Sequence, residues 1–359
     1  MAPPWFQLPP PGYGGIEWIC YWLVEGLVAR GHDVTVIGAG EKGVSANFVS
    51  TYEEPPSARL GEQLLELIHT ARAAEVLRSK TFDVVHDHTL SGPLLSLAGY
   101  APTVLTAHGP IHPDIADYYR TLYDYVSLVS ISESQRQGTP DLPWIGTIHN
   151  AIPVKEYTMM QDKEDFVLFL GRMNADKGAH LAIEAARDAG HPIVVAAKCN
   201  EAPERAYFDA EVKPRLGPDV HWIGEADTAT KKDLLARARC LVFPIQWEEP
   251  FGIVMCEAMA SGTPVVALRR GSVPEVLEHG VTGIICEHPD ELAEGITEAK
   301  GIDPNTCREQ ALSRFDLPRM VSEYEQVFQD VITRAQRGGE LPLPGREADD
   351  HLSAAGGAP

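Results

Sequence analysis

The chain has 359 residues, of which 44% are hydrophobic and 23% charged, a balance typical of a soluble globular protein long enough for two domains. Its formal net charge of -21 argues against nucleic acid and anionic membranes as main partners, because both favour clustered lysine and arginine. No long apolar run and no basic segment followed by an apolar core occurs, so we expect a cytoplasmic protein without strong membrane binding.

A turn rich in proline and glycine opens the chain and leads into a helix. The first fifteen residues hold five prolines and three glycines, and residues 16–30 follow as an amphipathic helix that Gly31 closes. Amide groups at such a helix start can bind an anion, so Gly14 and Gly15 are candidate phosphate contacts. Glycines at a helix start also serve as ordinary turn residues, so the signal is weak alone.

Histidines follow two short strands predicted in the first half of the chain. The cluster His86–His88 ends a strand at 82–86, and His108 follows a strand at 103–107. Neighbouring residues on a strand point to opposite faces, which disfavours a metal site in the cluster, and the six cysteines contain no C-x2-C pair. We therefore expect no metal and reduced core thiols. His108 is either a buried histidine bonded to a carbonyl or a residue facing a ligand.

Two cations follow the strand that begins the second half of the chain. Residues 166–170 form an apolar strand that runs directly into a loop carrying Arg172 and Lys177, ahead of a helix predicted over 180–189. Arg172 can hold a diphosphate through two parallel hydrogen bonds, and Lys177 can act on it as a point charge. The alternative is a solvated loop, which is more common for lysine than for an arginine beside a strand end.

The most informative stretch is a strand, helix, strand unit of a parallel sheet. It consists of a buried strand at 240–243, a helix at 252–260 and a further strand at 265–268. Glu249 precedes the helix and Glu257 lies within it. Eight helical steps would separate these two carboxylates by about 12 Å, too far for an acid and a base acting on one glycosidic bond.

That spacing instead suits a long ligand with two hydroxyl-bearing rings, such as a nucleotide sugar. The amides of Phe251, Gly252 and Ile253 would be free at the helix start to meet ligand oxygens. Alternatively, Glu249 is a first-turn acid that favours the helix dipole and Glu257 a solvated helix residue.

The run from Glu249 to Val266, which reads EPFGIVMCEAMASGTPVV, resembles the E-x7-E signature of retaining glycosyltransferases of family 4. The resemblance implies that Glu249 meets the donor sugar and Glu257 the ribose, with Ile253 and Val254 also in the donor site. Further residues take roles by the same resemblance: the donor phosphates would contact Gly14, Gly15, Arg172 and Lys177, and the donor hexose would contact His108. Glu249, His108, Arg172 and Lys177 would then be the catalytic residues.

The N-terminus departs from the family pattern. In family 4 a buried strand precedes the glycine turn, whereas this chain has only Met1–Phe6, with prolines at positions 3 and 4. Two explanations stay open: a start upstream of Met1, which we favour, or an N-terminal sheet built one strand short.

The resemblance implies an α/β fold of the GT-B type, with two doubly wound Rossmann-like domains facing a central cleft. We expect an acceptor-side domain over 1–155, a donor-binding domain over 156–337 whose last helix crosses back to the first, and a disordered tail over 338–359.

The implied activity is transfer of a hexosyl unit from a nucleotide diphosphate sugar to a carbohydrate, lipid or small-molecule acceptor, with retention of configuration and without metal or other cofactor. UDP-glucose and GDP-mannose are both candidate donors. Alternatives with the same fold are a nucleotide-sugar 2-epimerase, a phosphorylase with bound pyridoxal phosphate, and a non-catalytic nucleotide-sugar sensor. The oligomeric state stays open.

Overall fold

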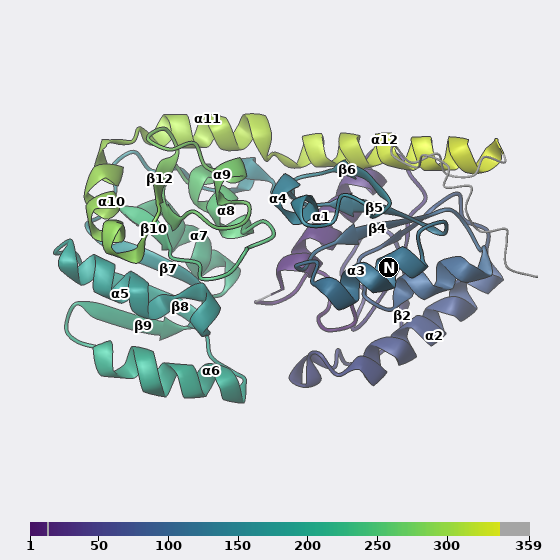
Figure 1. The fold of residues 1–359 in the computed structure, drawn as a ribbon, viewed down its shortest axis with the longest axis horizontal. Helices are drawn as coiled ribbons and strands as arrows, with labels where there is room; N and C mark the ends of the chain where they lie inside the picture. The colour runs from purple at the N-terminus through teal and green to yellow at the C-terminus, as the bar shows by residue number, and fades with distance from the viewer. Residues whose placement is uncertain (13, 338–359) are drawn as a thin grey trace, which may run out of the picture.

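The computed structural model describes residues 1–12 and 14–337, so the tail predicted over 338–359 lies outside the described residues. Two α/β lobes lie side by side, with the N-terminal lobe in purple and blue and the C-terminal lobe in teal and green (Figure 1). Every pairing between named strands is parallel. The expected α/β fold of two Rossmann-like domains is therefore confirmed.

The C-terminal lobe is built on one six-stranded sheet in the order β12-β11-β10-β7-β8-β9. Its central strands are buried apolar runs, as expected for a parallel sheet covered on both faces. The strands are β7 (Val167–Arg172), β8 (Ile193–Lys198), β9 (Val220–Gly224), β10 (Cys240–Phe243), β11 (Val265–Leu268) and β12 (Gly283–Cys286).

Helices connect and cover these strands. They are α5 (Ala179–Asp188), α6 (Ala202–Tyr207), α7 (Thr228–Arg237), α8 (Ile253–Ala260), α9 (Val273–Val276), α10 (Leu292–Glu298) and α11 (Pro304–Arg314). The segment 202–215 is not one regular α-helix. Helix α6 passes into a π-helical turn at Phe208–Val212 and a 3-10 turn at Lys213–Arg215, where Pro214 cannot donate a helical hydrogen bond.

The N-terminal lobe divides its strands between two sheets. A four-stranded sheet has the order β3-β4-β5-β6, and a separate pair joins β1 to β2. The strands are β1 (Thr35–Gly38), β2 (Asn47–Ser50), β3 (Val85–Asp87), β4 (Thr103–Ala107), β5 (Val126–Ser130) and β6 (Trp144–Thr147). The helices are α1 (Gly15–Ala29), α2 (Gln63–Ser79), α3 (Pro113–Thr121) and α4 (Glu133–Gln137).

A local hydrogen bond marks the passage from β5 to α4. Strand β5 ends at Ser130, two residues before Ser132. The Ser132 side chain accepts a hydrogen bond from the Gln135 amide at 3.1 Å and caps α4.

Helix α12 (Leu317–Gln336), in yellow, leaves the C-terminal lobe and runs along the N-terminal one (Figure 1). Its fully buried Tyr324 shares a 2.9 Å hydrogen bond with Thr106 of β4. The Arg30 guanidinium at the end of α1 donates to the Pro318 carbonyl at 2.8 Å and contacts Glu325 at 2.5 Å. The main apolar core accordingly includes side chains of both lobes.

The cysteines and the apolar character of the helices were also considered in the sequence predictions. All six cysteines are unpaired and five are buried, as expected for reduced core thiols. Across residues 1–12 and 14–337, we find no helix that combines the length and the apolar character needed to cross a bilayer.

Candidate functional site

A pocket of about 160 Å³ lies between the two lobes. The N-terminal lobe contributes the glycine turn and the tryptophans of α1, and the C-terminal lobe contributes the ends of β7 and β8 and the first turns of α7 and α8. The residues that carry the argument are Gly14, Gly15, Trp18, Lys231, Ile253 and Glu257. Five predicted donor-site residues, Gly14, Gly15, Ile253, Val254 and Glu257, therefore line one pocket.

Glu257 is a buried carboxylate on the wall of this pocket that the C-terminal lobe forms. It is only 3% exposed, and its Oε1 accepts hydrogen bonds from the Tyr157 hydroxyl at 2.8 Å and from Lys231 Nζ at 2.6 Å. Burial and the neighbouring carboxylate raise the pKa of Tyr157 far above its usual value, so the phenol stays a donor. The reading of Glu257 as a solvated helix residue is wrong.

Sequence reasoning missed Tyr157 and Lys231. Lys231 lies on α7 and Tyr157 precedes β7, so their contacts with Glu257 depend on how three separate elements pack. No spacing in the sequence signals such a cluster.

Glu249 and Lys177 form a second group, in the segments that precede α8 and follow β7. Lys177 Nζ lies 2.5 Å from Glu249 Oε2, and the Trp247 indole donates to the same oxygen at 2.9 Å. The ammonium also lies 5.4 Å from the Trp247 ring, a cation–π distance. A carboxylate held by a cation and an indole has a fixed orientation, which a residue that positions a ligand requires.

Gly252 lies immediately before α8, as its N-cap, in a left-handed backbone conformation that other residues rarely adopt. Its φ is 72°, and a Cβ there would lie 2.8 Å from Met255 and 3.0 Å from the Phe243 ring. The backbone can thus turn sharply into the helix, and the first amides of a helix have no carbonyl of a preceding turn to bond. Phe251 is 2% exposed and packs against Phe315, so its side chain belongs to the core and does not face a ligand.

Arg172 ends β7, next to Gly171 of the pocket lining. Its Nε donates to Glu204 Oε1 at 2.8 Å. Burial alone would raise the pKa of Glu204, but hydrogen bonds with Glu201, with Arg172 and with backbone amides hold it at about 2. Glu204 is thus an anion near neutral pH that orients the Arg172 guanidinium, and no motif or spacing in the sequence indicates it.

His108 stands at the end of β4, in contact with the histidine cluster. Its Nε2 lies 2.8 Å from His88 Nδ1, and the two rings stack with centroids 5.1 Å apart. His86 of the same cluster shares a 2.8 Å hydrogen bond with Thr106. Burial lowers the pKa of His108 to about 4, so its imidazole is neutral near pH 7.

The predicted site residues do not all line the interdomain pocket. The predicted residues outside its lining are Arg172, Lys177, Glu249, Phe251, Gly252 and His108. Arg172 is the last residue of β7, whereas Lys177 and Glu249 lie in the segments that follow β7 and β10. Among the described residues, no group of three or more histidine, cysteine, aspartate and glutamate side chains is arranged to hold a metal ion.

Family models cover both lobes. Residues 13–137 match the model for glycosyltransferase family 4, and residues 155–311 match the model for glycosyl transferases group 1. The alpha-maltose-1-phosphate synthase of Mycolicibacterium smegmatis is 29% identical in an alignment 365 positions long, gaps included, that covers 86% of this chain and 91% of that protein.

Two solved structures resemble this chain over nearly its whole length. AviGT4, a glycosyltransferase involved in avilamycin A biosynthesis, superposes with a TM-score of 0.70 at 26% identity, over 92% of this chain and 93% of that one. HepE of Anabaena, solved with UDP-glucose, superposes with a TM-score of 0.72 at 18% identity over 90% and 98% of the two chains, a likeness of fold alone.

The two-lobed fold and these matches define the chain as a glycosyltransferase with the GT-B fold. Within that class it is a family 4-like protein, because the family 4 model matches its first lobe and the group 1 model its second.

Proposed function

We propose that this glycosyltransferase moves a hexosyl unit from a nucleotide diphosphate sugar to an acceptor hydroxyl, with retention of anomeric configuration and without a metal. One observation carries the proposal: a glycine turn of one lobe and a buried, doubly hydrogen-bonded glutamate of the other line the same interdomain pocket. The glycine turn suits phosphates and the glutamate suits a diol.

Glu257 would accept hydrogen bonds from the ribose hydroxyls of the donor. Tyr157 and Lys231 occupy its Oε1, which fixes the carboxylate while Oε2 has further acceptor capacity. The apolar side chains that share the pocket, Trp18 and Val254 among them, would enclose the nucleoside.

Arg172, Lys177 and the amides at Gly14 and Gly15 would stabilise the diphosphate. When the C1–O bond of the donor breaks, negative charge develops on the leaving phosphate, and preorganised cations and amides favour that charge. The acceptor oxygen forms the new bond to C1 on the same face, and its proton passes to the leaving phosphate oxygen. Closure of the lobes would exclude water that would otherwise hydrolyse the donor.

Glu249, the first amides of α8 and His108 would orient the sugar. A neutral imidazole can donate one hydrogen bond and accept another, so His108 would bind a sugar hydroxyl without adding charge. The UDP-glucose bound to HepE supports a nucleotide sugar as donor, and UDP-glucose and GDP-mannose are the first two to test.

The test is a panel of labelled UDP- and GDP-sugars, with release of nucleoside diphosphate and the anomeric form of the product as readouts. We expect release with one donor and a product of the donor's own configuration. Binding without any release would support a sensor, and a changed sugar still attached to its nucleotide would support a 2-epimerase. An inverted product would overturn retention.

A further inference from the structure

The two lobes are joined by two stretches of backbone that lie side by side. The chain leaves the N-terminal lobe after β6 and returns to it at the start of α12. Where the stretches meet, the Ile152 amide donates to the Phe315 carbonyl at 3.0 Å, and the Leu317 amide donates to the Ile152 carbonyl at 3.0 Å. Two paired crossings of this kind allow the lobes to hinge, so a further contact between the lobes limits how they rotate.

Glu275 on α9 makes such a contact with the N-terminal lobe. Its Oε2 accepts a hydrogen bond from the Glu133 amide at 2.7 Å, and its Oε1 accepts one from the Ser134 amide at 2.6 Å, both in the first turn of α4. His149 Nε2 lies 3.0 Å from the same Oε2. Burial alone would raise the pKa of Glu275, but the hydrogen bonds from His149 and from the two amides lower it, so the carboxylate is charged near neutral pH.

Within its own lobe, Glu275 is attached to the segment that contains Glu249. Helix α9 follows Ser272, whose amide donates to the Glu249 carbonyl at 3.0 Å and whose hydroxyl donates to the Phe251 carbonyl at 2.8 Å. A Cβ at Gly271 would lie 2.2 Å from the Glu249 carbonyl oxygen, so the two backbones are in close contact. Glu275 therefore keeps a fixed place relative to the Glu249 backbone.

On the other lobe, α4 is attached to the segment that contains His108. Gln135 Nε2 donates to the Ala107 carbonyl at 2.9 Å and to the Gly109 carbonyl at 2.7 Å, on either side of His108. The amide oxygen of Gln135 accepts from the Ile131 amide at 2.9 Å, which fixes the orientation of the side chain. Gln135 directly follows the two amides that the C-terminal lobe binds, so α4 connects that lobe to the backbone around His108.

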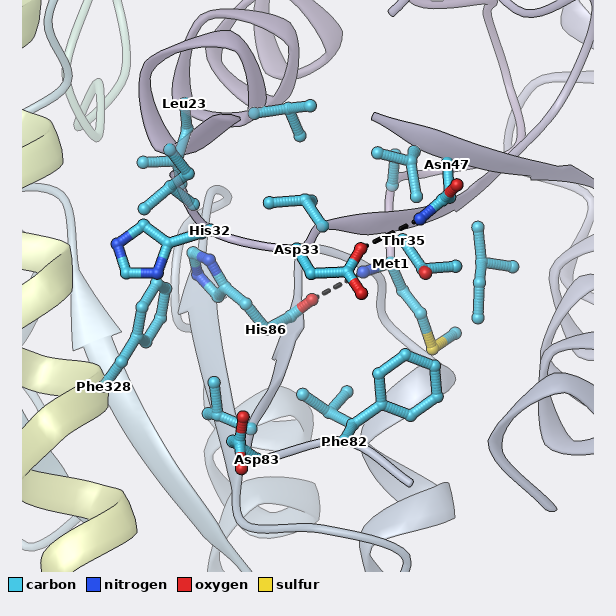
Figure 2. Close-up of a pocket in the computed structure, with 18 of the residues that line it drawn as sticks. Met1, Leu23, His32, Asp33, Thr35, Asn47, Phe82, Asp83, His86 and Phe328 are labelled. Carbon is cyan, nitrogen blue, oxygen red and sulfur yellow. Dashed lines mark hydrogen bonds between the residues drawn. The ribbon is translucent and has the colours of Figure 1, made fainter. Parts of the chain in front are cut away.

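A series of rings holds His108 to the rest of its lobe. His88 contacts the His108 ring, and the rings of His86 and His88 lie 4.1 Å apart between centroids. The His86 ring lies 5.2 Å from that of Phe328 on α12. Figure 2, a view into a separate cavity of about 440 Å³ in this lobe, shows His86 near Phe328. Because His108 is fixed within its lobe, the arrangement of the two lobes sets its position relative to Glu249.

We propose that Glu275 and Gln135 are positioning residues that hold His108 and Glu249 at one donor sugar. The inference rests on the proposed function, in which these two side chains orient the hexose from the two lobes. Hydrogen bonds and short backbone segments run without a break from Glu249 through Ser272, Glu275 and Gln135 to the carbonyls beside His108. The lining of the interdomain pocket includes neither Glu275 nor Gln135, so both act on the reaction through other residues.

The first test uses the protein without a donor. Glu275→Gln keeps the size of the side chain, but its NH2 group cannot accept a hydrogen bond, so one of the two α4 amides loses its partner. We expect hydrogen exchange at the Glu133 or Ser134 amide to become about 10-fold faster. The matched control is Glu278→Gln, an exposed glutamate of the segment after α9, which should leave exchange at both amides as in wild type. Unaltered exchange in Glu275→Gln would overturn the proposal.

The second test asks whether the two residues act through His108. Glu275→Gln and Gln135→Met, which lacks the amide donors, are each made in wild type and in His108→Ala. The readout is release of nucleoside diphosphate from the sugar that the wild-type enzyme uses. We expect each variant to lower turnover about 10-fold in wild type and by less than about twofold in His108→Ala, because the group that it misplaces is already gone.

The two ways in which the second test could fail are distinct. Equal losses of turnover in both backgrounds would indicate a general structural effect and would overturn the positioning role alone. A wild-type protein that turns over no nucleotide sugar would overturn the proposed function and the positioning role together. The exchange test, which needs no donor, decides the contact between Glu275 and α4 in either case.

Discussion

Lys177 and Glu249 form an ion pair at 2.5 Å between the loops that follow β7 and β10. These two strands are neighbours in the sheet and run parallel, so the residues after their carboxyl ends meet at one edge. The pair lies beside the first turn of α8, where free amides and a cation can act on one ligand. Lysine has three donor hydrogens, so Lys177 can hold Glu249 and a phosphate oxygen together.

Glu257→Gln should weaken donor binding above all. The amide keeps the shape of the carboxylate but loses the charge that strengthens hydrogen bonds to Lys231 and to the ribose diol. We expect the dissociation constant of the nucleoside diphosphate to rise about 10-fold or more, measured by calorimetry. The exposed Glu294→Gln on α10 is the control, and an unaltered affinity in Glu257→Gln would remove the ribose role.

Glu17→Gln should change how stability depends on pH. Glu17, 4% exposed on α1 behind Gly14, has a pKa raised by burial from 4.5 to about 7. Between these pH values the folded protein keeps a proton that the unfolded chain releases, so the free energy of unfolding falls as pH rises through this window, by about 3 kcal/mol at pH 8.

Glutamine cannot ionise, so this loss should vanish in Glu17→Gln. Thermal unfolding should give the variant a higher melting temperature than wild type at pH 8 and a similar one at pH 4.5. A difference between the two proteins that is equal at both pH values would contradict the buried, titrating carboxyl.

Gly26→Ala should loosen the contact between α1 and α12. A Cβ at Gly26 would lie 2.5 Å from Val321 Cγ2, and Val321 is a stiff, buried side chain. The gain in helix propensity is about 1 kcal/mol, whereas overpacking costs about 1–3 kcal/mol, so we expect a net loss of about 1 kcal/mol. Denaturant unfolding measures it. Gly301→Ala, where a Cβ meets nothing within 4 Å, is the control, and an equal effect in both variants would refute the close approach.

The second lobe could be predicted well because its signals are local. Apolar runs bounded by glycine and proline predicted β7, β10 and β11, and the helix α8 that connects β10 to β11. Parallel pairing brings the carboxyl ends of these strands to one edge of the sheet. That is why Arg172, Lys177 and Glu249 could be chosen from the sequence.

What the sequence could not give are the contacts between distant elements. Glu204 orients Arg172 from a helix 32 residues away, and Lys231 reaches Glu257 from another, through spacings that no motif encodes. The divided N-terminal sheet was foreseen only as a missing strand. The hydrogen bonds of Met1 with the backbone of His86 and His88 depend on how the lobe packs.

The turnover of Lys177→Ala tests the central claim most directly. The measurement is release of nucleoside diphosphate from the sugar that the wild-type enzyme uses, at saturating donor, with the exposed Lys213→Ala as control. If Lys177 stabilises the leaving diphosphate, turnover falls by about 10² or more while Lys213→Ala matches wild type. Turnover of Lys177→Ala within about twofold of wild type would contradict the proposed role of Lys177 at the donor diphosphate.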